Sequence, residues 1–290
     1  MKPKIIMHIN YCEQGQTVPE ICQKAVDWGF DGVEFRRKRR GIEESVEEYL
    51  DNIVRAAAKA KMKRVIFGEP GPDLMVAGAN ERRRELKEVI EFYRLAAVRF
   101  KLTTCNITAG ALLNPDKNVP YERYELHGSQ VATREQWDWT VSGFKTLGTL
   151  AEKLGFRLAF ETHMGYLHDL PRAAKKLSDL IGSPAIGVNL DYANYINFPN
   201  HLSIRETIEE MGDRLYYVHL KNSISAGKNV RFPSGLAQGE INNREFLGIL
   251  KERGYGGHIC IEAPRPGDRE YYAQQDIAYL KSLIKDIKWT

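Results

Sequence analysis

The sequence lacks the features that mark disulfide-rich, secreted or membrane-spanning chains. Only four of its 290 residues are cysteine and none forms a Cys-x-x-Cys pair, so a disulfide framework is not indicated. The first ten residues, MKPKIIMHIN, contain only a short apolar run with His8 and Asn10 in it. Such a run is too short for a signal peptide or a membrane span. These absences predict a cytoplasmic protein with no membrane partner.

The chain also has no large excess of charge of one sign. Its 42 Lys and Arg residues stand against 38 Asp and Glu residues, a net charge of +4, which is too balanced to mark a nucleic-acid-binding protein without a concentrated patch. Two short basic runs, at 36–40 and 82–84, could each be a solvated face or could attract an anionic substrate. We favour the solvated interpretation and expect no nucleic-acid partner.

A glycine-rich phosphate-binding loop is missing after the first apolar run, where the sequence reads HINYCEQGQT. This disfavours an open, doubly wound sheet. Short apolar runs instead alternate with amphipathic stretches of helix length along the whole chain, a pattern typical of parallel β/α units. Because eight parallel strands close a barrel, we predict an α/β fold, a (β/α)₈ TIM barrel, as a single domain over residues 1–290. The eight runs lie at 4–9, 32–35, 64–67, 103–107, 157–161, 186–191, 215–220 and 258–263.

Helix starts and loop lengths between these runs fit the same barrel. Capping boxes are predicted at Thr17 with Glu20, Thr133 with Gln136 and Ser203 with Glu206, and Asp169 before Pro171 predicts a further N-cap. The connections after the strands are the longer ones, notably 108–132, 192–202 and 221–242. We therefore expect the functional residues at the C-terminal ends of the strands.

Four residues with metal-binding side chains end the last four predicted strands: Glu161, Asp191, His219 and Glu262. Barrel closure would bring them into one ring, where three carboxylates without a cation would repel one another. One divalent metal ion removes that repulsion. A set of oxygen ligands with one nitrogen and no thiolate favours Mn²⁺, with Mg²⁺ or Co²⁺ as alternatives, over a structural zinc.

Four segments carry a resemblance to a known family: FETHMG, NLDYAN, YVHLKN and GEINNREFLGILKERGYGGHICIEAP. They resemble the xylose isomerase-like superfamily of sugar isomerases and epimerases, which includes ketose 3-epimerases, inosose dehydratase and apurinic endonuclease. The resemblance covers nearly the whole chain in strand order. It implies a single metal held by Glu161, Asp191, His219 and Glu262. In the ketose epimerases the two metal-bound glutamates are also the acid and base, which implies these catalytic roles for Glu161 and Glu262.

The resemblance also shows departures from the ketose epimerase pattern. Asn194 stands where many relatives have a histidine, and Leu167 and Ser225 stand where the ketose epimerases have Glu and Arg. Lys221 follows the His-x-Lys pattern of other branches, in which the ammonium would bind a substrate oxygen or stabilise an enolate. A solvated loop lysine is the alternative interpretation of Lys221.

Further candidate residues come from the ends of the same predicted strands. His163 could be a second acid/base or could orient another group. Sugar hydroxyls could be bound at five positions, although Glu34 could equally be a structural, salt-bridged carboxylate. These substrate-binding candidates are His8, Glu34, Glu69, Asn106 and Asn194.

The metal and the two glutamates predict an isomerase or epimerase that acts on a sugar or keto-sugar through an enediolate. The alternative is a lyase or dehydratase on a keto-inositol or 3-oxo-glycoside, because an enediolate with a leaving group in the β position eliminates. An endonuclease with three metals would need more ligands than seven histidines and Asn194 supply, and a non-enzymatic barrel would be expected to lose a ligand. We expect a small carbohydrate as the partner, and the sequence leaves a homo-oligomer open.

Overall fold

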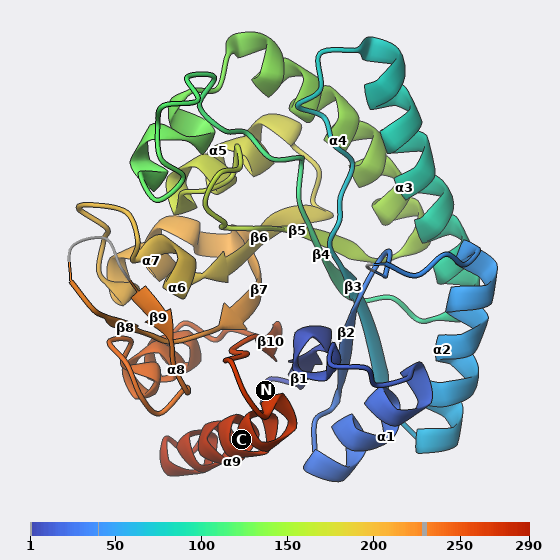
Figure 1. Cartoon of the computed structure of the whole chain (residues 1–290), viewed down its shortest axis with the longest axis vertical. Coiled ribbons are helices and arrows are strands. Elements are labelled where there is room, and N and C mark those ends of the chain that lie inside the picture. Colours follow the sequence, from blue (N-terminus) through green and yellow to red (C-terminus); the bar gives the residue numbers. More distant parts are fainter. Residues whose placement is uncertain (1, 40, 228–230) are drawn as a thin grey trace.

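The computed structural model describes residues 2–39, 41–227 and 231–290 (Figure 1). Its centre is an eight-stranded parallel sheet in the order β3-β2-β1-β10-β7-β6-β5-β4, rolled so that the end strands β3 and β4 lie side by side. The predicted (β/α)₈ TIM barrel is confirmed, and every predicted apolar run overlaps one strand, with β2 and β3 each ending one residue later than predicted. The strands are β1 (Ile5–His8), β2 (Gly32–Arg36), β3 (Arg64–Gly68), β4 (Thr104–Ile107), β5 (Arg157–Glu161), β6 (Ile186–Asp191), β7 (Leu215–Leu220) and β10 (His258–Ile261).

Helices surround the strands on the outside of the barrel (Figure 1). The predicted capping boxes are confirmed at the starts of α1, α4 and α7, where each N-cap side chain and the third helical residue satisfy each other's backbone N–H groups. The outer helices are α1 (Val18–Trp28), α2 (Val46–Ala60), α3 (Ala79–Arg99), α4 (Arg134–Leu154), α5 (Pro171–Ile181), α7 (Ile204–Met211), α8 (Asn243–Glu252) and α9 (Arg269–Asp286).

The predicted N-cap role of Asp169 is wrong. Helix α5 begins at Pro171 with Leu170 as its N-cap, and no side chain caps it. The Asp169 carboxylate instead accepts a hydrogen bond from the Ser129 N–H at 3.1 Å. Because Pro171 has no N–H of its own, this helix start has less need of a side-chain cap. Asp169 therefore holds the loop between β4 and α4.

The barrel interior contains a small apolar cluster, while the larger core fills the space between strands and helices. Successive side chains alternate between the two faces of a strand, so a residue two positions further along points to the same side. The interior apolar cluster is formed by Ile6, Ile66, Ala159, Tyr217 and Cys260. Two positions after four of these stand His8, Glu161, His219 and Glu262. The strand period thus carries these polar side chains to the barrel mouth directly above the apolar interior.

The connections that follow the strands carry additional short elements. A single helical turn, α6 (Tyr192–Tyr195), follows β6 directly, and the connection after β7 contains an antiparallel hairpin of β8 (Ser223–Ser225) and β9 (Arg231–Pro233). These elements lie on the C-terminal face, as expected from the loop lengths. Within the described ranges, no helix has the length and apolar character that crossing a membrane requires.

Candidate metal centre

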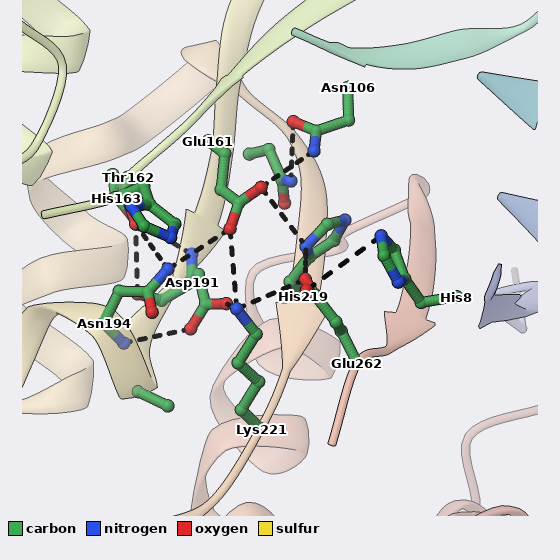
Figure 2. A network of polar contacts seen from close by, with 12 residues as sticks. His8, Asn106, Glu161, Thr162, His163, Asp191, Asn194, His219, Lys221 and Glu262 are labelled. Carbon is green, nitrogen blue, oxygen red and sulfur yellow. Dashed lines mark hydrogen bonds and ion pairs between the residues drawn. The ribbon is translucent and has the colours of Figure 1, made fainter. Parts of the chain in front are cut away.

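Four side chains from neighbouring strands converge at the mouth of the barrel (Figure 2). Asp191 of β6 and Cys260 of β10 are both register partners of His219 on β7, so the ends of these three strands are level. Glu161 ends β5 and Glu262 directly follows β10. One ligand atom from each of Glu161, Asp191, His219 and Glu262 lies within 4.8 Å of all the others. The structure therefore brings together the whole predicted ligand set.

Several atoms of this group are buried without a satisfactory hydrogen bond. His219 Nδ1 lies 2.7 Å from Glu262 Oε2 and 3.7 Å from Glu161 Oε2, yet neither Nδ1 nor Glu262 Oε2 makes a hydrogen bond of acceptable geometry. Asp191 Oδ2 is also buried and makes no hydrogen bond of acceptable geometry. Buried polar atoms without well-formed hydrogen bonds are costly, and a cation bound between them would satisfy all three. The donor set of three carboxylates and one imidazole fits a divalent metal ion.

The pKa shifts within this group also favour the binding of a cation. Burial opposes a positive charge on His219, but the carboxylates of Glu34 and Glu161 outweigh it and raise the pKa of the imidazole well above its usual value. Burial, together with the neighbouring Glu161 and Glu262, raises the pKa of Asp191. The cluster therefore attracts positive charge strongly, and a divalent cation would take the place of a proton.

Lys221 supplies one positive charge to this group from within the chain. Its Nζ lies 2.8 Å from Asp191 Oδ2, 3.2 Å from Glu262 Oε2 and 3.6 Å from Glu161 Oε1. Burial would lower the pKa of Lys221, but Asp191 and the two glutamates raise it well above its usual value. The ammonium thus stays charged at the mouth, and the solvated interpretation of Lys221 does not describe this environment.

Two asparagine side chains hold the Glu161 carboxylate from both sides. Asn106 donates to Oε2 at 2.8 Å, and Asn194 donates to Oε1 at 3.2 Å and to the carbonyl of Thr162 at 3.1 Å. Behind them, Asn189 donates to Asn106 Oδ1 at 3.1 Å. The substrate-binding candidates Asn106 and Asn194 therefore contact a ligand carboxylate. Asn189, which sequence reasoning missed, lies two residues before Asp191 on the same strand face.

His8 lies between two acidic side chains at the end of β1. Its Nδ1 accepts a hydrogen bond from the Asn10 N–H at 3.2 Å, so the proton of the neutral ring is on Nε2. That nitrogen lies 3.9 Å from Glu34 Oε1 and 4.0 Å from Glu262 Oε1. Asn10, also missed from sequence, donates to Glu262 Oε1 at 3.2 Å.

Glu34 lies beneath the four ligands and is fully buried. Its Oε2 is 3.0 Å from His219 Nε2 and accepts a hydrogen bond from the Tyr217 hydroxyl at 2.6 Å. Burial would raise the pKa of Glu34, but His219, His8 and the Tyr217 hydrogen bond lower it to about 2. Glu34 was predicted as either a sugar ligand or a salt-bridged structural carboxylate, and its contacts are those of the second kind.

Glu69 lies on the other side of the mouth, after β3. Its Oε2 is 3.4 Å from Arg36 Nη1, and Arg36 Nε is in turn 2.6 Å from Glu13 Oε1. Burial and the nearby Glu161 carboxylate raise the pKa of Glu69. Glu69 is therefore paired with Arg36, a member of the basic run at 36–40 in the sequence.

Most of the arginines in the two basic runs pair with other groups of the same chain. Arg40 lies outside the described residues. The remaining arginines have partners within the chain: Arg36 with Glu13, Arg37 with the Pro70 carbonyl, Arg39 with Glu44, Arg82 with the Val76 and Ala77 carbonyls, Arg83 with Asn80, and Arg84 with Glu81. These pairings favour a structural use of the charge over the binding of an anionic substrate. The solvated interpretation is wrong for Arg36 and Arg37, which are buried, whereas Arg84 is exposed.

His163 stands apart from the ligand group. Strand β5 ends at Glu161, so the strand alternation that would carry His163 to the same side does not continue. Its Nδ1 lies 2.9 Å from the Met164 carbonyl, and its ring meets the Tyr166 ring edge-on with centroids 5.2 Å apart. The backbone of Glu161 is contacted by another histidine, His168, whose Nδ1 is 2.5 Å from the Glu161 carbonyl oxygen.

Comparison with known proteins places this geometry in a family. Residues 22–283 match the family described as xylose isomerase-like TIM barrel. An inosose dehydratase of Clostridium perfringens is 23% identical over 151 residues, 47% of this chain and 50% of that protein. The chain thus spans about half the length of the curated relatives it matches.

Solved structures resemble the whole barrel. A D-psicose 3-epimerase from Clostridium cellulolyticum H10, solved with D-tagatose, has a TM-score of 0.76 at 14% identity, covering 98% of this chain and 99% of that one. A xylose isomerase-like TIM barrel protein from Mycobacterium smegmatis, solved in complex with magnesium, has a TM-score of 0.75 at 14% identity, covering 99% and 98%. The solved structures that resemble this chain thus include sugar epimerases, and the curated relatives that it matches include inosose dehydratases. The chain belongs to the xylose isomerase-like TIM barrel family.

Proposed function

We propose that this protein is a divalent-metal-dependent isomerase or epimerase of a sugar or keto-sugar, with Mn²⁺ as the preferred ion. We also propose that residues 1–290 form a single domain. The observation that carries the functional proposal is the convergence of three carboxylates and His219 within 4.8 Å, with buried atoms left unsatisfied. Cytoplasmic location and the absence of a nucleic-acid partner stay predictions, and a homo-oligomer stays open.

The two glutamates suit proton transfer at a carbon next to a carbonyl. Glu161 and Glu262 approach His219 Nδ1 from separate strands, at 3.7 and 2.7 Å. A carboxylate on each side of the substrate carbon can remove a proton from one face and return one to the other. When bound, the divalent cation would polarise the substrate oxygens and stabilise the negative charge that develops on them. Lys221 is positioned to bind a further substrate oxygen.

A lyase or dehydratase is the second candidate, and one asymmetry favours it. Both oxygens of Glu161 accept hydrogen bonds from asparagines, and its side chain is only 3% exposed, whereas that of Glu262 is 15% exposed. Elimination needs one base and an acid for the leaving group, which Glu262 and Lys221 could provide. The curated dehydratase relatives are consistent with this alternative.

Conservative glutamine variants test the proposed acid-base pair. Glu161→Gln and Glu262→Gln keep the side-chain volume and one ligand oxygen, so each should retain substrate binding while losing on the order of 10² in turnover. Turnover of keto-sugars and keto-inositols in D₂O, followed by NMR, measures both the rate and the exchange of the carbon-bound proton.

Glu252→Gln provides a matched control, because Glu252 is an exposed glutamate paired with Arg205 on the barrel surface. It should keep the wild-type rate. Loss in both site variants supports epimerisation, while loss confined to Glu262→Gln supports elimination. Near wild-type turnover in both would reject either mechanism.

A further inference from the structure

His219 stands between two groups that could hold a metal ion. Its Nδ1 faces Glu161, Asp191 and Glu262, whereas its Nε2 faces Glu34, with Cys260 also close enough to form a ligand set. A neutral imidazole carries its proton on one nitrogen and binds metal through the other. The partner that fixes this proton therefore determines on which side of His219 a cation can bind.

Glu34 has the contacts to fix it. Glu34 comes from β2 and crosses the barrel interior to His219 on β7, 185 residues further along the chain. Its Oε2 accepts a hydrogen bond from the Tyr217 hydroxyl at 2.6 Å and lies 3.0 Å from His219 Nε2. An ionised carboxylate has only lone pairs to offer the imidazole, so Nε2 must donate. The lone pair of Nδ1 then points toward the carboxylates.

We propose that Glu34 is a positioning residue, which holds His219 as the Nε2-protonated tautomer and directs Nδ1 into the metal centre. This inference rests on the proposed metal site. A carboxylate behind a metal-bound histidine fixes the orientation of the ring and makes the nitrogen a better donor. The Glu34 side is less suited to hold the ion itself, because it offers three residues instead of four and Glu34 Oε2 already has two partners.

Two substitutions of Glu34 separate its hydrogen-bonding role from its bulk. Glu34→Leu fills the space without an acceptor, while Glu34→Gln keeps an acceptor oxygen. Mn²⁺ titration of the metal-free proteins by calorimetry should give an affinity at least tenfold weaker for Glu34→Leu, within the 10–100-fold typical of such partners. Glu34→Gln should recover at least part of that loss.

Tyr217→Phe is the matched control, because it removes a buried hydrogen bond to the same carboxylate but leaves the contact with His219. Its Mn²⁺ affinity should stay within threefold of wild type. A Glu34→Leu protein within threefold of wild type would overturn the inference, as would equal losses in Glu34→Leu and Tyr217→Phe. If the wild type bound no metal, the metal site itself would fail, which distinguishes the two claims.

The tautomer can also be observed without any substitution at Glu34. In the Mg²⁺-loaded wild type labelled with ¹⁵N-histidine, the His219 ring, assigned by its loss in His219→Gln, should carry its proton on Nε2 and none on Nδ1. A proton on Nδ1 would contradict the inference, even if the Glu34→Leu protein failed to fold.

Discussion

His168 fixes the end of β5 from inside the protein. It is fully buried, its Nε2 accepts the Ala109 N–H at 3.2 Å, and its Nδ1 therefore donates to the Glu161 carbonyl at 2.5 Å. This neutral ring joins the loop after β4 to the residue that carries a ligand carboxylate. Nothing in the sequence pattern marked it, because the contact depends on a loop that turns back toward the barrel.

The burial of His168 predicts a specific loss of stability in acid. Burial lowers its pKa to about 4, below the usual value of about 6.5, so the unfolded chain binds this proton more readily than the folded protein. The stabilisation is complete above about pH 6.5 and is lost as the pH falls toward 4, by roughly 3 kcal/mol. His168→Gln should remove this pH dependence, which urea unfolding at pH 7 and pH 4.5 would measure. Equal losses in wild type and variant would contradict the assignment.

At the scale of strands, much of the centre could be predicted from the sequence. The strand ends and the period of two identified Glu161, Asp191, His219 and Glu262 as neighbours, because closure of a parallel barrel determines where such residues meet. The predicted run 157–161 gave the correct end of β5, but the pattern did not show how the chain turns after Glu161 and where it places His163. The reach of Glu34 across the interior also depends on strand tilt and side-chain length, which a single sequence does not reveal.

The approach of β3 to β2 gives a prediction at this scale. Gly68 is the last residue of β3, and a Cβ there would collide with Glu34 Oε1. Gly68→Ala should therefore displace the Glu34 carboxylate and weaken Mn²⁺ binding several-fold, although Gly68 is no metal ligand itself. Calorimetric titration measures the effect.

Gly248→Ala is the control for this substitution, since a Cβ at Gly248 in α8 meets no atom within 4 Å. It should leave metal affinity unchanged and favour the helix by up to about 1 kcal/mol. Unchanged Mn²⁺ affinity in a folded Gly68→Ala protein would show that the position of Glu34 does not matter to the metal.

For the whole molecule, closure of the barrel is what makes a site from distant segments. The sheet order places β10, β7, β6 and β5 side by side. Glu34 comes from β2, which lies three strands away from β7, the strand of His219. Solved structures share the shape of this barrel at 14% identity, so the fold tolerates wide change in sequence. Because a fold does not imply a function, the chemistry must be argued from the residues of the site. Whether a metal ion binds among these residues, and where, therefore tests the proposed site for the molecule as a whole.

A crystal of the wild-type protein soaked in Mn²⁺ and measured for anomalous scattering would test the central claim most directly. The account predicts one strong peak at the barrel mouth, in direct contact with His219 Nδ1 and with carboxylate oxygens of Glu161, Asp191 and Glu262. It also predicts that His219→Ala crystals lose this peak. A peak on the Nε2 side beside Glu34 and Cys260, or no peak in the barrel at full Mn²⁺ saturation, would contradict it.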